Sequence, residues 1–369
     1  MLRCAVFAGH SGGHLFPAAA FVDSLRERFP QSWTGLVTSR KAGPLISKLR
    51  PGLFDRVDYF PEFPFSLKSM GSFFRFLRAF VLAFFYLRKN KVQFCAGFGS
   101  YVSAPGVLMA KFLGIPTLIH EQNLIPGMAT RLLAKHADIV AVSFDETFKD
   151  LNLKRRVVTG LPLRPQLMNA AGCRGNADIA PTADFFHILV VGGSQGAHRL
   201  NELILESFSR LLPEEKKKIA VTHLTGTEDF NWVSKKYLEL GIQGEVYPFY
   251  DTMEHLYPKA DMAITRAGAN TLFELALFKL PAVVVPYPHA GAHQYANAES
   301  FAGRGAVILE EENTLTAEKL LAQILKLKNN PEERRALSDA MAGLSHSDAG
   351  SRLAETAMNL IERRAYACH

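Results

Sequence analysis

The sequence predicts an α/β protein made of two domains, each built around a sheet of parallel strands, that face each other across a cleft. Short apolar runs alternate with longer amphipathic stretches along the whole chain, a pattern typical of parallel strands joined by helical crossovers. The chain has 369 residues, of which 48% are hydrophobic, which suits two cores better than one. Each half also opens with a strand that ends in a glycine-rich loop.

The strands are predicted from apolar runs of strand length. In the first half these are residues 4–9, 34–39, 92–97, 116–121 and 138–144, and in the second half residues 186–193, 219–226, 245–250, 261–268, 281–288 and 306–311. Residues 161–183 interrupt the alternation with three prolines and two glycines, so we predict domains at 1–163 and 164–344. Residues 345–369 continue as a helical pattern.

The first loop, Gly9 to His14 (GHSGGH), joins the first strand to a helix that Pro17 is predicted to lead. Backbone N–H groups at such a turn bind anions, and glycine allows a ligand to approach closely. The alternative is that the glycines only let the helix pack against the sheet. The spacing is not GxGxxG, the second strand ends without a carboxylate, and no Walker A sequence is present, so NAD and ATP fit poorly.

The net charge of +7 is concentrated in one region. No acidic residue lies between Glu62 and Glu121, whereas seven lysines and arginines do. A helix predicted over residues 70–91 combines these cations with aromatic and apolar side chains, which favours an anionic membrane surface over a nucleic acid. A buried helix with snorkelling arginines is the alternative. The residues of this predicted membrane patch are Phe73, Phe74, Arg75, Arg78, Val81, Phe85, Arg88 and Lys89.

Two further loops of the second half follow strands and open helices. Residues 192–197 (GGSQGA) repeat the glycine loop and add the Ser194 hydroxyl, which suits a phosphate. Residues 266–274 (RAGANTLFE) follow another strand; Asn270 or Thr271 is predicted to cap the helix, and the Glu274 carboxylate could accept hydrogen bonds from a ribose. An ordinary first-turn glutamate is the alternative for Glu274. Two glycine loops indicate two phosphorylated ligands.

Polar residues also follow other strands. His120-Glu121 does not begin an HExxH zinc motif, because Leu124 stands where the second histidine would be. Amide side chains such as Asn123 and Gln294 suit sugar hydroxyls.

The four cysteines form no CxxC pair, so we expect neither disulfides nor a zinc site, and we expect a reducing compartment. The N-terminal run is too short for an export signal, and no segment reaches the ~20 apolar residues of a transmembrane helix.

Six segments taken together resemble the MurG-type transferases of glycosyltransferase family 28, in order and over nearly the whole chain. They are GHSGGHLFPAAA, GFGSYVSAPG, IPTLIHEQN, VVGGSQGAHRLN, RAGANTLFELA and HQYANA. The resemblance implies the GT-B fold, with the C-terminal helix packed on the first domain. It also implies a hexosyltransferase that moves N-acetylglucosamine (GlcNAc) from UDP-GlcNAc to the muramyl pentapeptide carried by undecaprenyl diphosphate, in peptidoglycan synthesis.

The resemblance also implies roles for single residues. The first loop would hold the acceptor diphosphate and part of the donor, and Glu274 would bind the ribose. Asn123 and Gln294 would contact the sugar, Arg164 a phosphate, and Tyr250 the uracil. The remaining residues expected near phosphates are Ser11, Gly12, Gly13, Ser194, Gln195, Gly196, Ala269, Asn270 and Thr271. His10 departs from the family pattern, which has glycine there.

The implied reaction is an inverting displacement through an oxocarbenium-like transition state. His14 is the candidate general base, because imidazole titrates near neutral pH. The alternative is that His14 donates to a phosphate or caps the helix.

No pair of carboxylates with DxD-like spacing stands out, so we expect no tightly held metal; stimulation by a loosely bound divalent cation is left open. Expected partners are UDP-GlcNAc, the undecaprenyl-linked acceptor, an anionic membrane and other cell-wall synthesis proteins, but no nucleic acid.

These expectations place the protein peripherally on the cytoplasmic face of the plasma membrane. Two other activities share the predicted fold. A transferase acting on another lipid, such as diacylglycerol, would keep the donor site and the membrane patch. A UDP-GlcNAc epimerase would consume the nucleotide sugar with no acceptor present.

Overall fold

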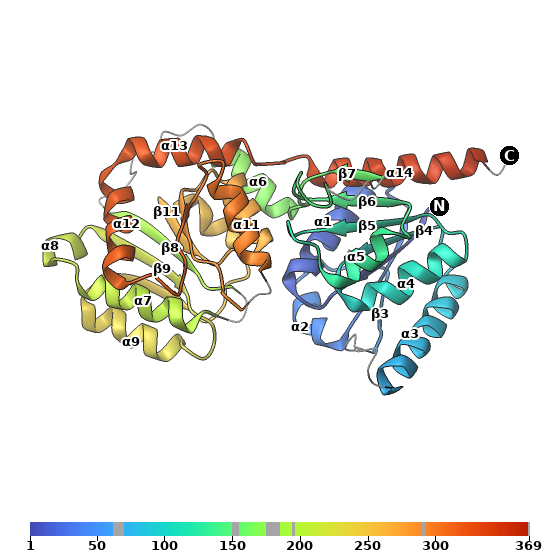
Figure 1. Ribbon diagram of the computed structural model, residues 1–369, viewed down its shortest axis with the longest axis horizontal. Helices are drawn as coiled ribbons and strands as arrows, with labels where there is room; N and C mark the ends of the chain where they lie inside the picture. The colour runs from blue at the N-terminus through green and yellow to red at the C-terminus, as the bar shows by residue number, and fades with distance from the viewer. Residues whose placement is uncertain (62–69, 150–154, 175–184, 194–195, 290–291, 368–369) are drawn as a thin grey trace. The chain divides into compact units, whose positions relative to one another are not determined.

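The computed structural model describes residues 1–61, 70–149, 155–174, 185–193, 196–289 and 292–367 (Figure 1). The chain divides into two compact units. Unit 1 comprises Met1–Pro165 together with His346–His369, and unit 2 comprises Gln166–Ser345. Each unit has its own sheet and its own hydrophobic core, and each is described by itself below.

Unit 1 is an α/β/α sandwich. Its sheet has the order β3-β2-β1-β4-β5-β6-β7, with every described pair parallel. From β1 the strand order runs outward to β2 and β3 on one side and to β4 through β7 on the other. The boundary between β1 and β4 is therefore the switch point of a Rossmann-like fold. The elements are β1 (Arg3–Ala8), α1 (Gly12–Arg28), β2 (Trp33–Thr38), α2 (Gly43–Ile46), β3 (Arg56–Tyr59), α3 (Met70–Lys89), β4 (Phe94–Phe98), α4 (Ser100–Phe112), β5 (Thr117–Glu121), α5 (Met128–Ala134), β6 (Ile139–Val142), β7 (Arg156–Val158) and α14 (Ala349–Ala367).

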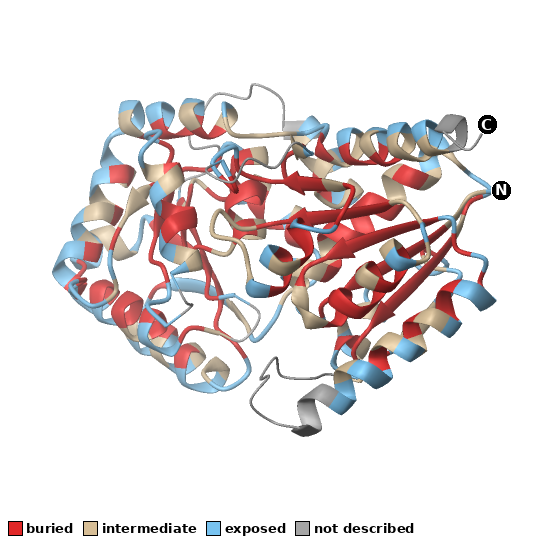
Figure 2. Ribbon diagram, turned by 45° about the vertical axis from the view of Figure 1, so that its right-hand side comes forward, coloured by how far each residue is buried: buried red, intermediate tan, exposed pale blue. Residues whose placement is uncertain are grey.

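Both faces of the unit 1 sheet are buried, as Figure 2 shows by colour. Successive side chains of a strand point to opposite faces. In β1, Val6 therefore joins the core beneath α1 and α14, whereas Phe7 joins the core beneath α3, α4 and α5. A strand buried on both faces reads as a continuous apolar run, which is why the sequence identifies β1 so clearly.

The C-terminal helix α14 packs on α1 within unit 1. Leu353 and Ala357 are fully buried in the same core as α1. Near the other end of the helix, the Arg364 guanidinium donates to the Asp138 carboxylate at 2.9 Å and to the Gly114 carbonyl at 2.9 Å. The last helix of the chain thus completes one face of the N-terminal sheet.

Unit 2 repeats the same plan. Its sheet has the order β10-β9-β8-β11-β12-β13, again with parallel pairs and a switch point between β8 and β11. The elements are α6 (Pro165–Arg174), which begins at the unit boundary, β8 (Phe186–Val191), α7 (His198–Ser209), α8 (Pro213–Lys216), β9 (Ile219–Leu224), α9 (Phe230–Leu240), β10 (Gln243–Tyr247), β11 (Met262–Thr265), α10 (Ala269–Leu277), β12 (Ala282–Val284), α11 (His293–Ala302), β13 (Ile308–Leu309), α12 (Ala317–Asn329) and α13 (Pro331–Ala342).

The predicted α/β class is confirmed, and each of the eleven apolar runs overlaps a strand. The sequence missed β3 and β7, which are edge strands with half-exposed, partly charged residues. It also read residues 161–183 as an interruption, whereas α6 occupies part of that segment. Pro165 is compatible with α6 because it stands at the first helical position, where no N–H bond is lost.

Candidate active site

The first glycine loop connects β1 to α1 at the carboxyl edge of the unit 1 sheet. Ser11 is the N-cap residue of α1, and its carbonyl accepts from the N–H groups of His14 (3.1 Å) and Leu15 (3.0 Å). The Ser11 hydroxyl makes no capping hydrogen bond. The helix therefore begins at Gly12 and Gly13, which places its positive dipole end in the loop where the sequence predicts a diphosphate.

The His14 imidazole is clamped between two glycines. A Cβ atom on Gly9 would lie 2.5 Å from His14 Cδ2, and one on Gly99 would lie 2.6 Å from His14 Cε1 and Nδ1. Gly99 also has φ +63°, a conformation that disfavours any side chain. These two positions require glycine because the imidazole ring fills the space that a side chain would need.

Burial favours the neutral form of the His14 imidazole. Burial lowers the pKa of His14, and the nearby Glu121 carboxylate opposes this only in part. A histidine with a pKa below its usual value carries a free lone pair at pH 7, which a general base needs. His14 Nδ1 lies 3.1 Å from Gln122 Oε1. The structure thus holds a neutral imidazole in a fixed orientation at the head of α1.

The loop after β5 is organised by Glu121. This buried carboxylate accepts from the Asn123 N–H at 3.0 Å, from Asn123 Nδ2 at 3.3 Å and from the Gly127 N–H at 3.3 Å. Glu121 therefore shapes the loop, and Asn123, predicted to contact the sugar, lies next to the His14 partner Gln122. His120 Nε2 also donates within the protein, to the Gly160 carbonyl oxygen at 3.0 Å.

Arg164 approaches the first loop from the end of unit 1. Its guanidinium carbon lies 4.7 Å from the ring centroid of Phe16, in the first turns of α1. That ring in turn contacts Gly12, where a Cβ atom would lie 2.9 Å from Phe16 Cε2. The predicted second domain begins at Arg164, but the compact unit that contains this residue is unit 1. Its charge therefore stands beside the first glycine loop.

The second glycine loop follows β8 in unit 2, and Ser194 and Gln195 lie outside the described residues. Gly196 has φ +78°, and a Cβ atom there would lie 2.6 Å from the Thr225 carbonyl oxygen. The loop therefore packs closely on the end of β9. Tyr250 lies beyond the next strand, with its ring centroid 4.9 Å from that of Tyr247, and the Tyr247 carbonyl accepts from Thr225 N–H at 3.0 Å. The second loop and Tyr250 thus lie at neighbouring strand ends.

The helix after β11 begins differently from the prediction. Its N-cap residue is Gly268 and no side chain caps it, because α10 already starts at Ala269. The prediction that Asn270 or Thr271 caps this helix is therefore wrong, and both residues lie in the first turn. A glycine N-cap with no capping side chain keeps the helix dipole directed at the loop, as in α1.

Glu274 is buried, with 7% of its surface exposed, and its Oε2 accepts from the Tyr257 hydroxyl at 2.7 Å. Tyr257 itself is 1% exposed and stacks on Phe278 at 5.1 Å. The hydrogen bond fixes one carboxylate oxygen inside the protein. Glu274 is thus a positioned carboxylate and not a mobile surface glutamate.

Gln294 and Asn297 on α11 hold the loop after β11. Gln294 Oε1 accepts from the N–H groups of Ala267 (3.2 Å) and Tyr287 (2.9 Å), and Asn297 Nδ2 donates to the Ala267 carbonyl at 3.2 Å. Because Gln294 Oε1 accepts hydrogen bonds from the backbone, the Nε2 group is the part of this amide that could donate to a sugar hydroxyl. The side chain predicted to bind sugar therefore also ties two strand ends together.

Helix α3 presents an apolar and basic face to solvent. Ala79 and Ala83 are fully buried against the domain, whereas Phe74 (60%), Val81 (46%) and Phe85 (63%) are exposed. We call the exposed set the α3 surface; the side chain of Phe73 lies outside the described residues. Its members are Phe74, Arg75, Leu77, Arg78, Val81, Phe85, Arg88 and Lys89.

None of the helices that the structure describes has the length and apolar content needed to cross a membrane.

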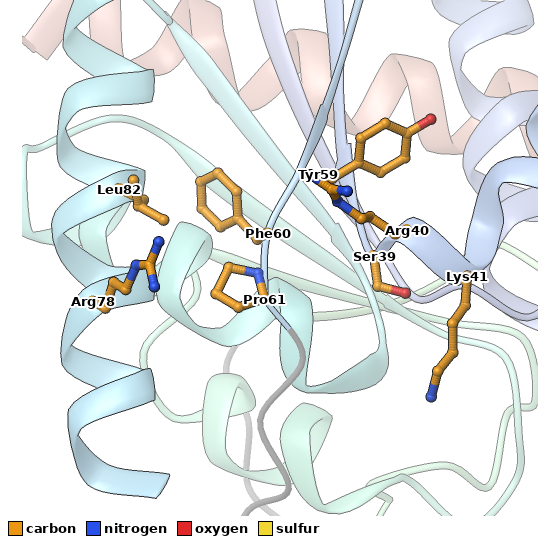
Figure 3. Close-up of a pocket in the computed structure, with 8 residues that line it drawn as sticks. All are labelled: Ser39, Arg40, Lys41, Tyr59, Phe60, Pro61, Arg78 and Leu82. Carbon is orange, nitrogen blue, oxygen red and sulfur yellow. The ribbon is translucent and has the colours of Figure 1, made fainter. Parts of the chain in front are cut away.

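A pocket of about 540 Å³ lies beside α3 (Figure 3). Arg78 and Leu82 of α3 project toward Phe60 and Pro61, while Arg40 and Lys41 come from the segment after β2. The pocket thus combines three cationic side chains with apolar walls. The full lining consists of Ser39, Arg40, Lys41, Tyr59, Phe60, Pro61, Arg78 and Leu82.

Sequence reasoning missed three groups that position the predicted residues: Gln122, Gly99 and Tyr257. For Gln122 a signal existed, because residues two apart in a strand share a face and Gln122 stands two residues after His120. For Gly99 and Tyr257 the sequence offers none, since their partners His14 and Glu274 are brought to them only by the fold.

Comparisons with known proteins agree with this architecture. Residues 4–142 match the glycosyltransferase family 28 N-terminal domain, and residues 187–353 match the family 28 C-terminal domain. A relative from Thermodesulfovibrio yellowstonii is 33% identical over 98% of this chain and 100% of its own length. It is named UDP-N-acetylglucosamine–N-acetylmuramyl-(pentapeptide) pyrophosphoryl-undecaprenol N-acetylglucosamine transferase.

Solved structures show the same fold. The crystal structure of Acinetobacter baumannii MurG is similar with a TM-score of 0.76 and 27% identity, covering 97% of this chain and 100% of that one. A UDP-GlcNAc 2-epimerase from Neisseria meningitidis, bound to UDP-GlcNAc, reaches a TM-score of 0.70 at 14% identity, covering 97% and 100%. The epimerase shares the fold alone. With both domain models matched and a full-length relative at 33% identity, the chain belongs to glycosyltransferase family 28.

Proposed function

We propose that this protein transfers GlcNAc from UDP-GlcNAc to the muramyl 4-hydroxyl of undecaprenyl-diphosphate-linked muramyl pentapeptide, with inversion at the anomeric carbon. The observation that carries the proposal is the end-to-end identity of 33% with a relative named for this transfer. The site geometry supports it, because both sheets end in loops that suit phosphates.

The donor site is assigned to unit 2. The Gly192–Ala197 loop and the N-terminus of α10 supply backbone N–H groups for the UDP diphosphate, with Ser194 and Gln195 as added donors. Glu274, already held by Tyr257, accepts from the ribose hydroxyls, and Tyr250 is proposed to contact the uracil. Gln294 Nε2 donates to the sugar. As UDP leaves, negative charge grows on the diphosphate, and preorganised dipoles of this kind stabilise it by several kcal/mol.

The acceptor site is assigned to unit 1. The N-terminus of α1 with Ser11, Gly12 and Gly13 takes the acceptor diphosphate, and the Arg164 guanidinium beside Phe16 adds positive charge. His14 takes the proton from the muramyl hydroxyl as that oxygen attacks the anomeric carbon. Its lowered pKa suits this role, because the neutral form predominates at pH 7.

The α3 surface is proposed to bind the anionic cytoplasmic face of the plasma membrane, where the lipid-linked acceptor resides. Exposed phenylalanines insert at the interface and the flanking cations attract acidic headgroups. Arg78 also lines the pocket of Figure 3, which brings positive charge and apolar walls together beside the helix.

Transfer of labelled GlcNAc to a short-chain muramyl-pentapeptide lipid tests the proposal. We expect product with this acceptor, none with diacylglycerol, and no consumption of UDP-GlcNAc without an acceptor. Label on diacylglycerol would indicate a transferase of different specificity. Conversion of UDP-GlcNAc alone would indicate the epimerase activity of the structural neighbour, whose likeness at 14% identity concerns the fold.

Replacing the base tests the mechanism. His14→Ala is expected to lower kcat by about 10²-fold to 10⁴-fold, the usual contribution of a general base, with little change in KM for UDP-GlcNAc. Steady-state kinetics measure both. His136→Ala, which removes an exposed histidine of the same unit, is the matched control. Near-normal turnover of His14→Ala would remove this residue from the mechanism.

Glu274→Gln tests the donor site. Hydrogen bonds to a charged group contribute about 1.5–3 kcal/mol, so the dissociation constant for UDP should rise roughly tenfold to a hundredfold. Isothermal titration calorimetry with UDP gives this value directly. Glu332→Gln, at an exposed position of α13, should bind as the unmodified protein does. An unchanged affinity in Glu274→Gln would argue against ribose binding by this carboxylate.

Loss of the aromatic groups tests the α3 surface. The double variant Phe74→Ser/Phe85→Ser is expected to bind vesicles containing about one-third anionic lipid at least tenfold more weakly, since each buried Phe contributes about 1.5–3 kcal/mol. Vesicle co-sedimentation measures binding. Leu238→Ser, at a leucine 84% exposed on α9, is the control. Equal vesicle binding by both variants would contradict insertion of Phe74 and Phe85 into the membrane.

A further inference from the structure

An unbroken chain of hydrogen-bonding groups runs through unit 1 to His14. His14 Nδ1 lies 3.1 Å from Gln122 Oε1, Gln122 Nε2 lies 3.3 Å from His120 Nδ1, and His120 Nε2 lies 3.0 Å from the Gly160 carbonyl oxygen. The groups come from the head of α1, from β5 and the residue after it, and from the loop after β7. None of the three side chains carries a formal charge when both histidines are neutral.

The far end of this chain fixes the tautomer of His120. A carbonyl oxygen only accepts, so the nitrogen that faces Gly160 must be the protonated one. Burial lowers the pKa of His120 to about 4, although the bond to Gly160 opposes this. His120 is therefore neutral at pH 7, with its proton on Nε2 and a lone pair on Nδ1.

The orientation of the Gln122 amide follows from the same reasoning. Its Nε2 lies 3.3 Å from His120 Nδ1 and 3.3 Å from the His120 carbonyl oxygen. Both are acceptors, so the NH₂ group must face them and Oε1 must face His14. Gln122 is 2% exposed, which leaves little room for the amide to rotate.

At the near end, Gln122 Oε1 can only accept, so His14 must carry its proton on Nδ1. In a neutral imidazole the other nitrogen, Nε2, is then the proton acceptor. The ring cannot turn over freely, because Gly9 and Gly99 hold it on close contact. Among the described residues, no other hydrogen bond to His14 competes with this arrangement.

We propose that Gln122 and His120 are positioning residues that hold His14 in the tautomer whose Nε2 is unprotonated and ready to accept a proton. The inference rests on the proposed role of His14 as the general base. In many enzymes a carboxylate orients the catalytic histidine and stabilises its charged form. Here a neutral amide does the orienting, and its hydrogen bond opposes the lowering of the His14 pKa by burial without reversing it.

The tautomer of His14 can be read without substrate. Long-range ¹H–¹⁵N correlation spectra of histidine-labelled protein near pH 8 distinguish Nδ1–H from Nε2–H imidazoles, and the signals lost in His14→Ala assign this residue. We expect a proton on Nδ1 and none on Nε2. A proton found on Nε2 would overturn the inference, whatever the enzymatic activity.

Kinetics of Gln122→Met test the consequence. This variant keeps the approximate side-chain volume but removes the hydrogen bonds of Gln122 to His14 and His120. We expect kcat to fall at least tenfold while KM for both substrates stays within about twofold, because the wrong His14 tautomer impairs proton transfer and not binding. In a His14→Ala background, Gln122→Met should lower kcat less than twofold further. An equal loss in both backgrounds would show that Gln122 acts through general structure and would overturn the inference.

The matched control is Gln323→Met, which removes a glutamine that donates to Glu310 at 2.8 Å in unit 2 and should leave kcat unchanged.

Failure of the proposed function is a separate outcome. If the unmodified protein transfers no GlcNAc to the muramyl lipid, that function is wrong, yet the spectra still decide whether Gln122 and His120 set the His14 tautomer.

Discussion

The architecture depends on the parallel pairing of every described strand. In a parallel sheet all strands end at the same edge, and each following helix begins there with its N–H groups and positive dipole end exposed. Residues far apart in sequence, such as Gly13 and Gln122 in unit 1 or Gly196 and Glu274 in unit 2, follow strands that end at that edge. The placement of the helix N-termini that we propose to bind phosphates is thus a consequence of topology, and the side chains refine it.

Close backbone packing is the second theme of the site. The glycines at 9 and 99 leave room for an imidazole, and Gly196 leaves room for the end of β9. In each case the missing side chain is replaced by a neighbouring group and not by empty space. This explains why the loops are glycine-rich without having the spacing of a dinucleotide-binding motif, whose glycines serve a pyrophosphate in a different turn.

Buried neutral histidines recur in both units. In unit 2, His223 is bonded through Nδ1 to the Tyr237 hydroxyl and through Nε2 to Asn201 Oδ1, both at 3.0 Å, and burial lowers its pKa to about 3. Asn201 Nδ2 donates to the Thr225 carbonyl, which fixes that amide as Gln122 is fixed in unit 1. The protein therefore orients these imidazoles with amides, which satisfies the ring nitrogens without placing a charge on the ring.

The sequence by itself determined the α/β class, the eleven apolar strands, both glycine loops and the amphipathic α3, because each is written in local composition and period. It missed β3 and β7, since edge strands need no apolar run, and it misplaced the cap of α10, since Gly268 and Asn270 are both acceptable caps. Tertiary structure alone decided three contacts: that of Gln122 with His14, the hydrogen bond of Tyr257 to Glu274, and the stacking of Arg164 on Phe16. Each joins residues at least 17 positions apart, and only the folded sheet brings such partners within hydrogen-bonding or stacking distance.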